Sequence, residues 1–140
     1  MEGPQRGDSD GRVGCRGRVL VVEDDVELRS FLASCLESAG YQAIVSNNGW
    51  QGLRAVDTFH PQVAVVDLNL PVMSGFRFLY LLRRDGTGDQ RRVPVIVISG
   101  DDAAQCKELV MEVKPEAYLQ KPFGPDELLE RVEKLLGSQE

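Results

Sequence analysis

Cysteine is scarce in this chain: it has three cysteines in 140 residues, Cys15, Cys35 and Cys106, and no C-x-x-C spacing. An odd number of cysteines without that spacing indicates neither a disulfide framework nor a zinc site. No apolar run approaches the ~20 residues that a bilayer-spanning helix needs, and Met1 is followed by no apolar core of a secretory signal. We therefore expect a cytoplasmic protein in a reducing setting, with no membrane partner.

An excess of positive charge is also missing. The chain has 22 acidic residues against 16 lysines and arginines, for a formal net charge of -6. Affinity for nucleic acid rests on Lys and Arg neutralising phosphates, so this balance leads us to expect no nucleic-acid partner. Contents of 42% hydrophobic and 27% charged residues are ordinary for a globular protein. At this length we expect a single domain.

The first 17 residues have almost no apolar side chain and five glycines, interleaved with Arg and Asp. Such a segment cannot bury enough surface to offset the entropy lost on ordering. We expect residues 1–17 to be a disordered Gly/Arg-rich tail and residues 18–137 to form the folded domain. Because the chain ends almost directly after its last expected helix, we also expect no output domain.

Four short apolar runs each end in a residue that can handle a phosphoryl group. The runs start at Val19, Val63, Val95 and Tyr118, and they end in Glu23-Asp24-Asp25, Asp67, Ser99 and Lys121-Pro122. Apolar, β-branched runs separated by helical patterns are typical of buried parallel strands. The carboxyl ends of parallel strands lie along one edge of a sheet, which is where such folds bind ligands. These polar residues are therefore expected to meet.

Helical periodicity separates the runs. Apolar residues recur at helical spacing from Leu28 to Ala39, and again around Leu53, Leu79 and Leu128. Tyr41–Ser46 is expected to be a second, less apolar strand at an edge, and a fourth helix is expected within Ala103–Val113. The order is five β–α units. It predicts an α/β fold, with a doubly wound parallel sheet covered by helices on both faces.

The acids of the first and third strand ends suggest a metal site. Unit charges ~4 Å apart repel by ~4 kcal/mol at an effective dielectric of ~20, so Glu23, Asp24 and Asp67 can gather only if protonated or around a cation. Oxygen ligands without His or Cys favour a hard ion, Mg²⁺ before Ca²⁺. Lys121 would add a fixed positive charge. The competing interpretation makes Glu23-Asp24-Asp25 a helix cap with first-turn charge.

Residues 18–136 resemble the receiver domain of two-component response regulators. The resemblance rests on Val21-Val22-Glu23-Asp24, Asp67-x-Asn69-x-Pro71-x-x-x-Gly75, Ile98-Ser99 and Tyr118-Leu119-Gln120-Lys121-Pro122-Phe123. It implies a flavodoxin-like (βα)5 fold with strand order 2-1-3-4-5, as in the chemotaxis regulator. It also implies a place in a two-component or phosphorelay system.

The resemblance implies a role for each site residue. Asp67 would take a phosphoryl group from the phosphohistidine of a histidine kinase. Asp24 would bind Mg²⁺ directly, Glu23 partly through water, and Asn69 through its backbone carbonyl, with Asp67 completing the metal site. Ser99 and Lys121 would each contact a phosphoryl oxygen during the transfer.

The resemblance also implies a switch. Ser99 would be drawn towards the phosphoryl group, and the aromatic ring of Tyr118 would then turn inward. This would shift the population between two packings of a protein-binding surface. The Lys121–Pro122 peptide bond would be cis.

The expected function is a signalling receiver that catalyses only its own phosphorylation and dephosphorylation. Its partners would be a sensor histidine kinase or phosphotransfer protein and a downstream target protein, and a phosphorylation-dependent homodimer is left open.

Three alternatives are also left open by the sequence. One is a Mg²⁺-dependent aspartyl-phosphate phosphatase, although such enzymes commonly need an acid/base Asp where this chain has Asn69. The second is an interaction module without phosphorylation. The third is a receiver fragment of a larger regulator or hybrid kinase.

Overall fold

A computed structural model describes residues 15–70, 72–84, 93–100 and 115–137 of the chain. In chain order the elements are β1 (Arg18–Val22), α2 (Val26–Ser38), β2 (Gln42–Ser46), α3 (Gly49–Phe59), β3 (Val63–Asp67), α4 (Gly75–Arg84), β4 (Val95–Ser99), β5 (Ala117–Gln120) and α6 (Pro125–Gly137). No helix within these ranges is both long and apolar enough to cross a membrane. The expected helix within Ala103–Val113 lies outside the described residues.

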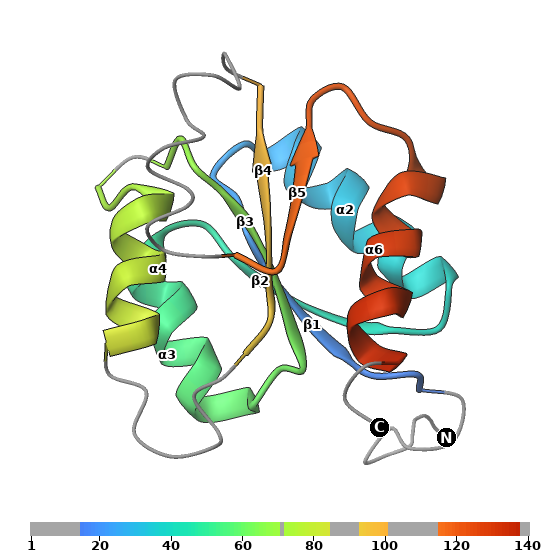
Figure 1. The fold of residues 1–140 in the computed structure, drawn as a ribbon, viewed down its shortest axis with the longest axis horizontal. Helices are drawn as coiled ribbons and strands as arrows, with labels where there is room; N and C mark the ends of the chain where they lie inside the picture. Colours follow the sequence, from blue (N-terminus) through green and yellow to red (C-terminus); the bar gives the residue numbers. More distant parts are fainter. Residues whose placement is uncertain (1–14, 71, 85–92, 101–114, 138–140) are drawn as a thin grey trace.

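The five strands form one parallel sheet in the order β2-β1-β3-β4-β5. This is the order that the family resemblance implied, and it places β2 at an edge, as its weaker apolar pattern predicted. Helices α3 and α4 cover one face of the sheet, and α2 and α6 cover the other (Figure 1). The fold is therefore the flavodoxin-like α/β arrangement expected from the sequence.

The central strands are apolar throughout because both faces of the sheet are buried. Successive side chains of a strand point to opposite faces. Leu20 and Val22 accordingly join the core under α3 and α4, while Val19 and Val21 join the core under α2 and α6. Every residue of β3 and β4 is buried, including the polar Asp67 and Ser99 at their carboxyl ends. In the described ranges, the buried polar residues Glu23, Ser46, Asp67 and Ser99 all lie at the carboxyl ends of strands.

Side-chain caps begin two of the helices. The Asp25 carboxylate accepts a hydrogen bond from the Leu28 N–H at 2.8 Å, and the Asn48 side chain accepts one from the Gln51 N–H at 2.9 Å. Each bond satisfies a backbone donor that has no partner within the helix. His60 ends α3 in the left-handed conformation, with φ of 52°, and is exposed. The only histidine of the chain therefore serves as a helix C-cap.

The described chain begins before β1, within the segment expected to be a tail. The Arg16 N–H donates to the Gly40 carbonyl at 2.8 Å, and its guanidinium lies 4.8 Å from the centre of the Tyr41 ring. The same guanidinium contacts Glu133 at 3.2 Å. Arg16 is thus held against α6 and the end of α2, whereas residues 1–14 lie outside the described part.

Candidate functional site

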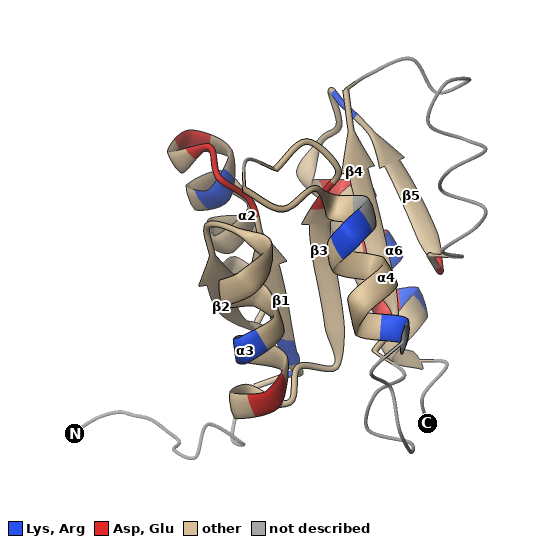
Figure 2. Ribbon diagram, turned by 90° about the vertical axis from the view of Figure 1, so that its left-hand side faces the viewer, with Lys and Arg blue, Asp and Glu red and all other residues tan. Residues whose placement is uncertain are grey.

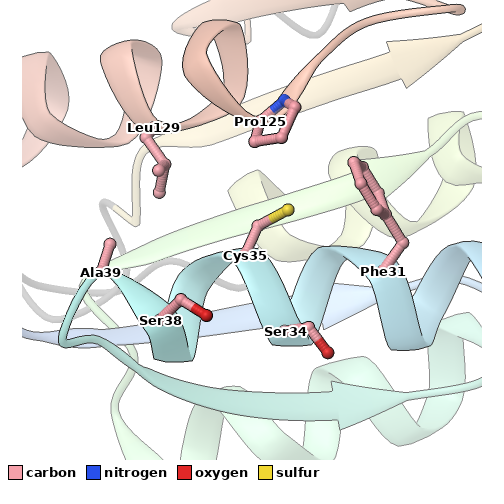
Figure 3. A pocket seen from close by; sticks show the side chains of 7 residues that line it. All are labelled: Phe31, Ser34, Cys35, Ser38, Ala39, Pro125 and Leu129. Carbon is pink, nitrogen blue, oxygen red and sulfur yellow. The ribbon is translucent and has the colours of Figure 1, made fainter.

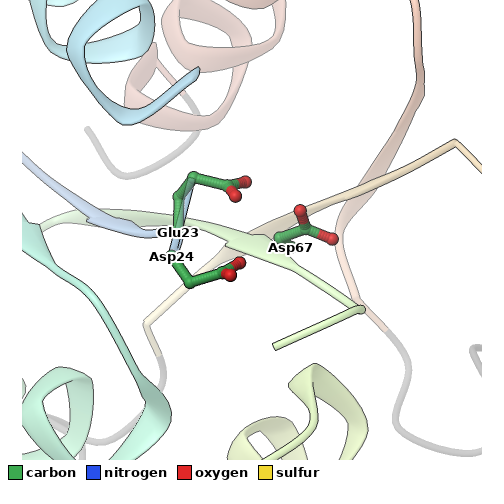
Figure 4. Close-up of side chains that lie close together, drawn as sticks. All are labelled: Glu23, Asp24 and Asp67. Atoms are coloured by element: carbon green, nitrogen blue, oxygen red, sulfur yellow. The ribbon is translucent and has the colours of Figure 1, made fainter. Parts of the chain in front are cut away.

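Three carboxylates converge at the carboxyl edge of the sheet. Glu23 and Asp24 directly follow β1, and Asp67 is the last residue of the neighbouring strand β3. One oxygen atom from each of the three lies within 4.8 Å of the others. Figure 4 shows the Glu23 and Asp24 carboxylates side by side, both extending towards Asp67. The parallel pairing of β1 with β3 therefore produces the acid cluster that the sequence predicted.

The three acidic residues before α2, Glu23-Asp24-Asp25, have different contacts. Asp25 turns away to cap the helix, as the simpler interpretation of the triplet predicted, while Glu23 and Asp24 join Asp67. The Asp25 N–H donates to Glu23 Oε2 at 3.0 Å. The helix-cap interpretation is confirmed for Asp25, while Glu23 and Asp24 lie in the acid cluster that the metal-site interpretation expected.

Glu23 is the least compensated member of the cluster. It is only 1% exposed, and its Oε1 atom is buried without a hydrogen-bond partner among the described residues. Burial and the adjacent Asp67 raise its pKa from 4.5 to about 8, and the opposing effects of the Asp25 N–H and Lys121 only partly offset this rise. A carboxylate in this position needs either a proton or a nearby cation.

Asp67 has partners on both of its carboxylate oxygens. The Asn69 N–H donates to Oδ1 at 2.9 Å, and the Lys121 ammonium donates to Oδ2 at 2.9 Å. The side chain of Asp67 is only 3% exposed, whereas that of Lys121 is 32% exposed. Lys121 is therefore the solvent-facing member of this ion pair, and Asp67 is the buried one.

The Lys121 ammonium is held in its charged form. Burial lowers its pKa, but the hydrogen bond to Asp67 and the charges of Asp67, Glu23 and Asp24 outweigh that effect, so the net shift is upward. The Lys121 N–H also donates to the Ser99 carbonyl at 2.8 Å, which ties the end of β5 to the end of β4. The Lys121–Pro122 peptide bond is cis, as the family resemblance implied.

Ser99 and Tyr118 lie on the two strands that complete the site. Ser99 ends β4 and is fully buried, and β4 pairs with β3 so that Ile98 lies opposite Asp67. Tyr118 is in β5 and packs against the core under α3 and α4. Its hydroxyl is buried, and none of the residues that the structure describes forms a hydrogen bond with it. All the predicted site residues thus lie along the carboxyl edge of the sheet or in the strands leading to it.

Close packing of two backbone segments explains why the motif that begins at Asp67 has glycine at position 75. The Gly75 N–H donates to the Leu68 carbonyl at 3.0 Å, so the start of α4 folds back onto the end of β3. A Cβ atom at position 75 would lie 2.5 Å from the Asp67 carbonyl oxygen and 2.7 Å from the Leu68 Cα. Only glycine permits this close approach of two backbone segments.

Arg29 was not anticipated by the sequence patterns. Its Nη1 atom donates to the Glu23 carbonyl at 3.0 Å and reaches the Asp24 carbonyl at 3.4 Å. The signal that could have identified it is its place, four residues after the Asp25 cap. A cation so close to a helix N-terminus opposes the helix dipole, and its presence there calls for another reason.

Charge is unevenly distributed around the site. Figure 2 shows acidic positions gathered in the loop from β1 to α2, with one basic position on α2 beside them. Arg29 is the only Lys or Arg in that helix. The acid edge is therefore flanked by two cations of known contacts, Lys121 on the Asp67 side and Arg29 behind the Glu23-Asp24 loop.

A pocket of about 450 Å³ lies between α2 and α6, away from the acids. Figure 3 shows its lining: Phe31, Ser34, Cys35, Ser38, Ala39, Pro125 and Leu129. None of the three clustered acids contributes to it. Its wall is mainly apolar, and burial raises the pKa of the Cys35 thiol, so this pocket offers neither acid–base groups nor an activated nucleophile.

The chemistry of the acid cluster suits a hard cation. Its ligand atoms are all carboxylate oxygens, and the buried Glu23 Oε1 lacks any other partner. Hard divalent cations prefer oxygen ligands, and a cation would compensate the mutual repulsion of the carboxylates. The residues present therefore fit a Mg²⁺ ion.

Comparison with known proteins agrees with this geometry. Residues 19–133 match the family model described as the response regulator receiver domain. The DNA-binding response regulator MtrA of Mycobacterium tuberculosis is 34% identical over 117 residues, which is 84% of this chain and 49% of that protein.

Two solved structures are also similar. The Francisella response regulator 1452 receiver domain has a TM-score of 0.81 and 30% identity, covering 89% of this chain and 100% of that one. The receiver domain of a sensor histidine kinase from Pseudomonas aeruginosa PAO1, described with a magnesium ion in its active site cleft, has a TM-score of 0.79 and 26% identity. That match covers 86% of this chain and 98% of the other.

The chain spans about half the length of the curated response regulators that it matches. Some of them are named DNA-binding regulators, so the comparisons give no support to the expectation that nucleic acid is excluded as a partner. The family match covers β2 to β5, all of β1 except Arg18, and the residues Glu23, Asp24, Asp67, Ser99 and Lys121. This chain therefore belongs to the response regulator receiver domain family.

Proposed function

We propose that the chain is a phosphoacceptor whose Asp67 takes a phosphoryl group from a phosphohistidine of a sensor histidine kinase or phosphotransfer protein. The observation that carries this proposal is the convergence of Glu23, Asp24, Asp67 and Lys121 at one edge of the sheet. Phosphoryl transfer needs an attacking oxygen, in-line positioning and positive charge near the transferred group. These residues can supply each requirement.

Asp67 is the nucleophile in this proposal. One of its carboxylate oxygens attacks phosphorus, an O–P bond forms, and the P–N bond to the donor imidazole breaks, with the imidazole leaving as the protonated or neutral base. The Asn69 N–H on Oδ1 fixes the rotation of the carboxylate. The Lys121 ammonium donates to Oδ2 before the transfer, and it would then pair with a negatively charged phosphoryl oxygen.

Glu23, Asp24 and Asp67, with the Asn69 carbonyl, would hold a Mg²⁺ ion. When bound, the ion would supply positive charge that offsets the repulsion between the carboxylates and the incoming phosphoryl oxygens. The magnesium described for the similar Pseudomonas receiver supports this assignment. The buried, unpartnered Glu23 Oε1 supports it independently.

Ser99 and Tyr118 would transmit the phosphorylation of Asp67 to a protein-binding surface. The buried Ser99 hydroxyl would contact a phosphoryl oxygen, and Tyr118 would move with the packing beside it. The output would be altered binding of a downstream protein in the cytoplasm, without any reaction on a separate substrate. No enzyme family is indicated by the match to signalling receivers.

A phosphate-affinity gel tests this function. Incubation with acetyl phosphate and Mg²⁺ should give a slower-migrating band, and EDTA should prevent it. Asp67→Asn keeps the size of the side chain but removes the nucleophile, so its band should not shift. Asp57→Asn, an exposed acid on α3, is the matched control and should shift like the wild type. A wild-type chain that stays unmodified with acetyl phosphate and with histidine kinases would contradict the proposal.

A further inference from the structure

Glu23 and Asp24 present a geometric problem that the acid cluster alone does not solve. They are consecutive residues, and consecutive side chains of an extended strand point to opposite faces. Both of their carboxylates nevertheless lie within 4.8 Å of an Asp67 oxygen and of each other. The backbone must therefore turn directly after β1, and something must hold that turn.

Local hydrogen bonds hold only part of the turn. The Asp25 N–H donates to Glu23 Oε2 at 3.0 Å, and Asp25 in turn caps the helix through Leu28. These two bonds fix N–H groups. Among the described residues, no backbone N–H of the loop donates to the carbonyl oxygens of Glu23 and Asp24.

Arg29 supplies a donor instead. Its Nη1 donates to the Glu23 carbonyl at 3.0 Å and lies 3.4 Å from the Asp24 carbonyl. Among the described residues, no other donor has a recorded hydrogen bond to either oxygen. A guanidinium is suited to this contact because its planar, charged head presents several donors in fixed directions.

The position of Arg29 strengthens the inference. It lies four residues after the Asp25 cap, in the first turns of α2, where a positive charge opposes the helix dipole. Its side chain is half-buried, so it is held in place and does not extend into solvent. The contacts of its guanidinium are with the backbone carbonyls of Glu23 and Asp24 and not with their carboxylates. Arg29 thus acts on the loop backbone.

We infer that Arg29 is a positioning residue of the acid cluster: it holds the Glu23 and Asp24 carbonyls so that both carboxylates turn towards Asp67. The inference rests on the proposed function, because the turn matters for the Mg²⁺ affinity of the cluster. Removing a group that orients the ligands of a metal typically lowers the affinity for the metal by about 10- to 100-fold.

Calorimetric titration of Mg²⁺ into the full chain tests this inference. Arg29→Met removes the donors but keeps an unbranched stem like the aliphatic part of arginine, and its dissociation constant for Mg²⁺ should rise about tenfold. Arg29→Lys keeps a charged donor and should lie between Met and wild type. Arg54→Met, an exposed arginine on α3, is the matched control and should bind like the wild type.

Phosphorylation by acetyl phosphate gives a second readout. The Mg²⁺ concentration for half-maximal labelling should rise in Arg29→Met about as much as the dissociation constant, while the maximal rate at saturating Mg²⁺ should stay within about twofold of wild type. A general loss of folding would lower both. Circular dichroism and thermal melting without Mg²⁺ should therefore match the Arg54→Met control.

The possible outcomes distinguish a failure of the Mg²⁺ assignment from a failure of the role inferred for Arg29. Wild type that binds no Mg²⁺ would overturn the metal assignment and this inference with it. Wild type that binds Mg²⁺, with Arg29→Met binding within twofold of Arg54→Met, would overturn this inference alone. So would weaker binding that is equal in Arg29→Lys and Arg29→Met and is accompanied by loss of the folded spectrum in both.

Discussion

At the scale of single residues, the site combines groups that repel one another. The Glu23 carboxyl is buried beside Asp67, and its Oε1 has no hydrogen-bond partner. Burial and the adjacent Asp67 raise its pKa to about 8, which favours its protonated form. Lys121 and the Asn69 N–H donate hydrogen bonds to the two carboxylate oxygens of Asp67.

Stability of the metal-free chain should therefore fall as the pH rises. The folded pKa of Glu23, about 8, is above its ordinary value of 4.5, so the folded state binds more protons between these values. The free energy of unfolding should decrease by up to ~1.4 kcal/mol per pH unit across that window. Urea denaturation in EDTA at several pH values measures this slope.

Glu23→Gln provides the control for the pH series, because it removes the titrating group at similar volume. Its free energy of unfolding should depend less on pH than that of the wild type. Adding Mg²⁺ at pH 8 should restore wild-type stability and leave Glu23→Gln less affected. Equal pH slopes in the two proteins would show that Glu23 does not titrate in this window.

Tyr118→Phe should cost no stability. The Tyr118 hydroxyl is buried and has no hydrogen-bond partner in the described part of the chain, and an unsatisfied buried polar group is unfavourable by about 1–3 kcal/mol. Removing it should leave the free energy of unfolding unchanged or raise it by up to ~1 kcal/mol, as measured by urea denaturation. A loss above ~1 kcal/mol would mean that the hydroxyl has a partner in the folded protein.

At the scale of elements, the site depends on how tightly α4 returns to the end of β3. The Gly75 N–H bonds to the Leu68 carbonyl, and the backbone of Gly75 lies against that of Asp67. Exposed Val72, in the same loop, has a φ of 44°, which is unusual for a β-branched residue. The conformation of this loop sets where the Asp67 carboxylate and the Asn69 N–H lie.

Gly75→Ala should disturb both the fold and the site. The added Cβ would lie 2.5 Å from the Asp67 carbonyl oxygen, so the start of α4 must move away. Overpacking of this kind costs about 1–3 kcal/mol of stability. Phosphorylation of Asp67 by acetyl phosphate should also slow, because the shift displaces the nucleophile.

Gly137→Ala is the matched control for this comparison, since a Cβ there meets no atom within 4 Å. Its free energy of unfolding should stay within ~0.5 kcal/mol of the wild type. If Gly75→Ala were as stable and as reactive as Gly137→Ala, the tight return of α4 would not be needed for the site.

At the scale of the whole molecule, much of the site could be predicted because parallel strands share one carboxyl edge. Apolar runs marked the strands, so Asp67, Ser99 and Lys121 could be placed at one edge without coordinates. Asp24 and Glu23 followed for the same reason. Local sequence patterns are sufficient to predict a site wherever the topology itself brings the ends of strands together.

Contacts made by long side chains could not be predicted in this way. Arg29 reaches back to two carbonyls, and Arg16 contacts Tyr41 and Glu133, which are far away in the sequence. Such contacts depend on side-chain rotamers, and the periodicity of the sequence carries no information about rotamers. Arg16 was read as part of a tail for this reason, and the role of Arg29 emerged only from its hydrogen bonds.

Mg²⁺ should stabilise the whole chain. A ligand that binds only the folded state adds RT ln(1 + [L]/Kd), which is ≈ 2.7 kcal/mol at a concentration 100 times Kd. Thermal melting should therefore shift upward with Mg²⁺ but not with Na⁺ at equal ionic strength. Asp24→Asn removes one clustered charge and should reduce the shift, whereas Asp57→Asn on α3 should retain it.

The most direct test of the account is to identify the residue that carries the phosphoryl group. Borohydride reduces an aspartyl phosphate to homoserine, and mass spectrometry of the resulting peptides then reveals the modified position. After treatment with acetyl phosphate and Mg²⁺, we expect homoserine at position 67 alone, and none when EDTA replaces Mg²⁺. Homoserine at another aspartate with position 67 unchanged would contradict the assignment of the acid cluster as the phosphoacceptor site.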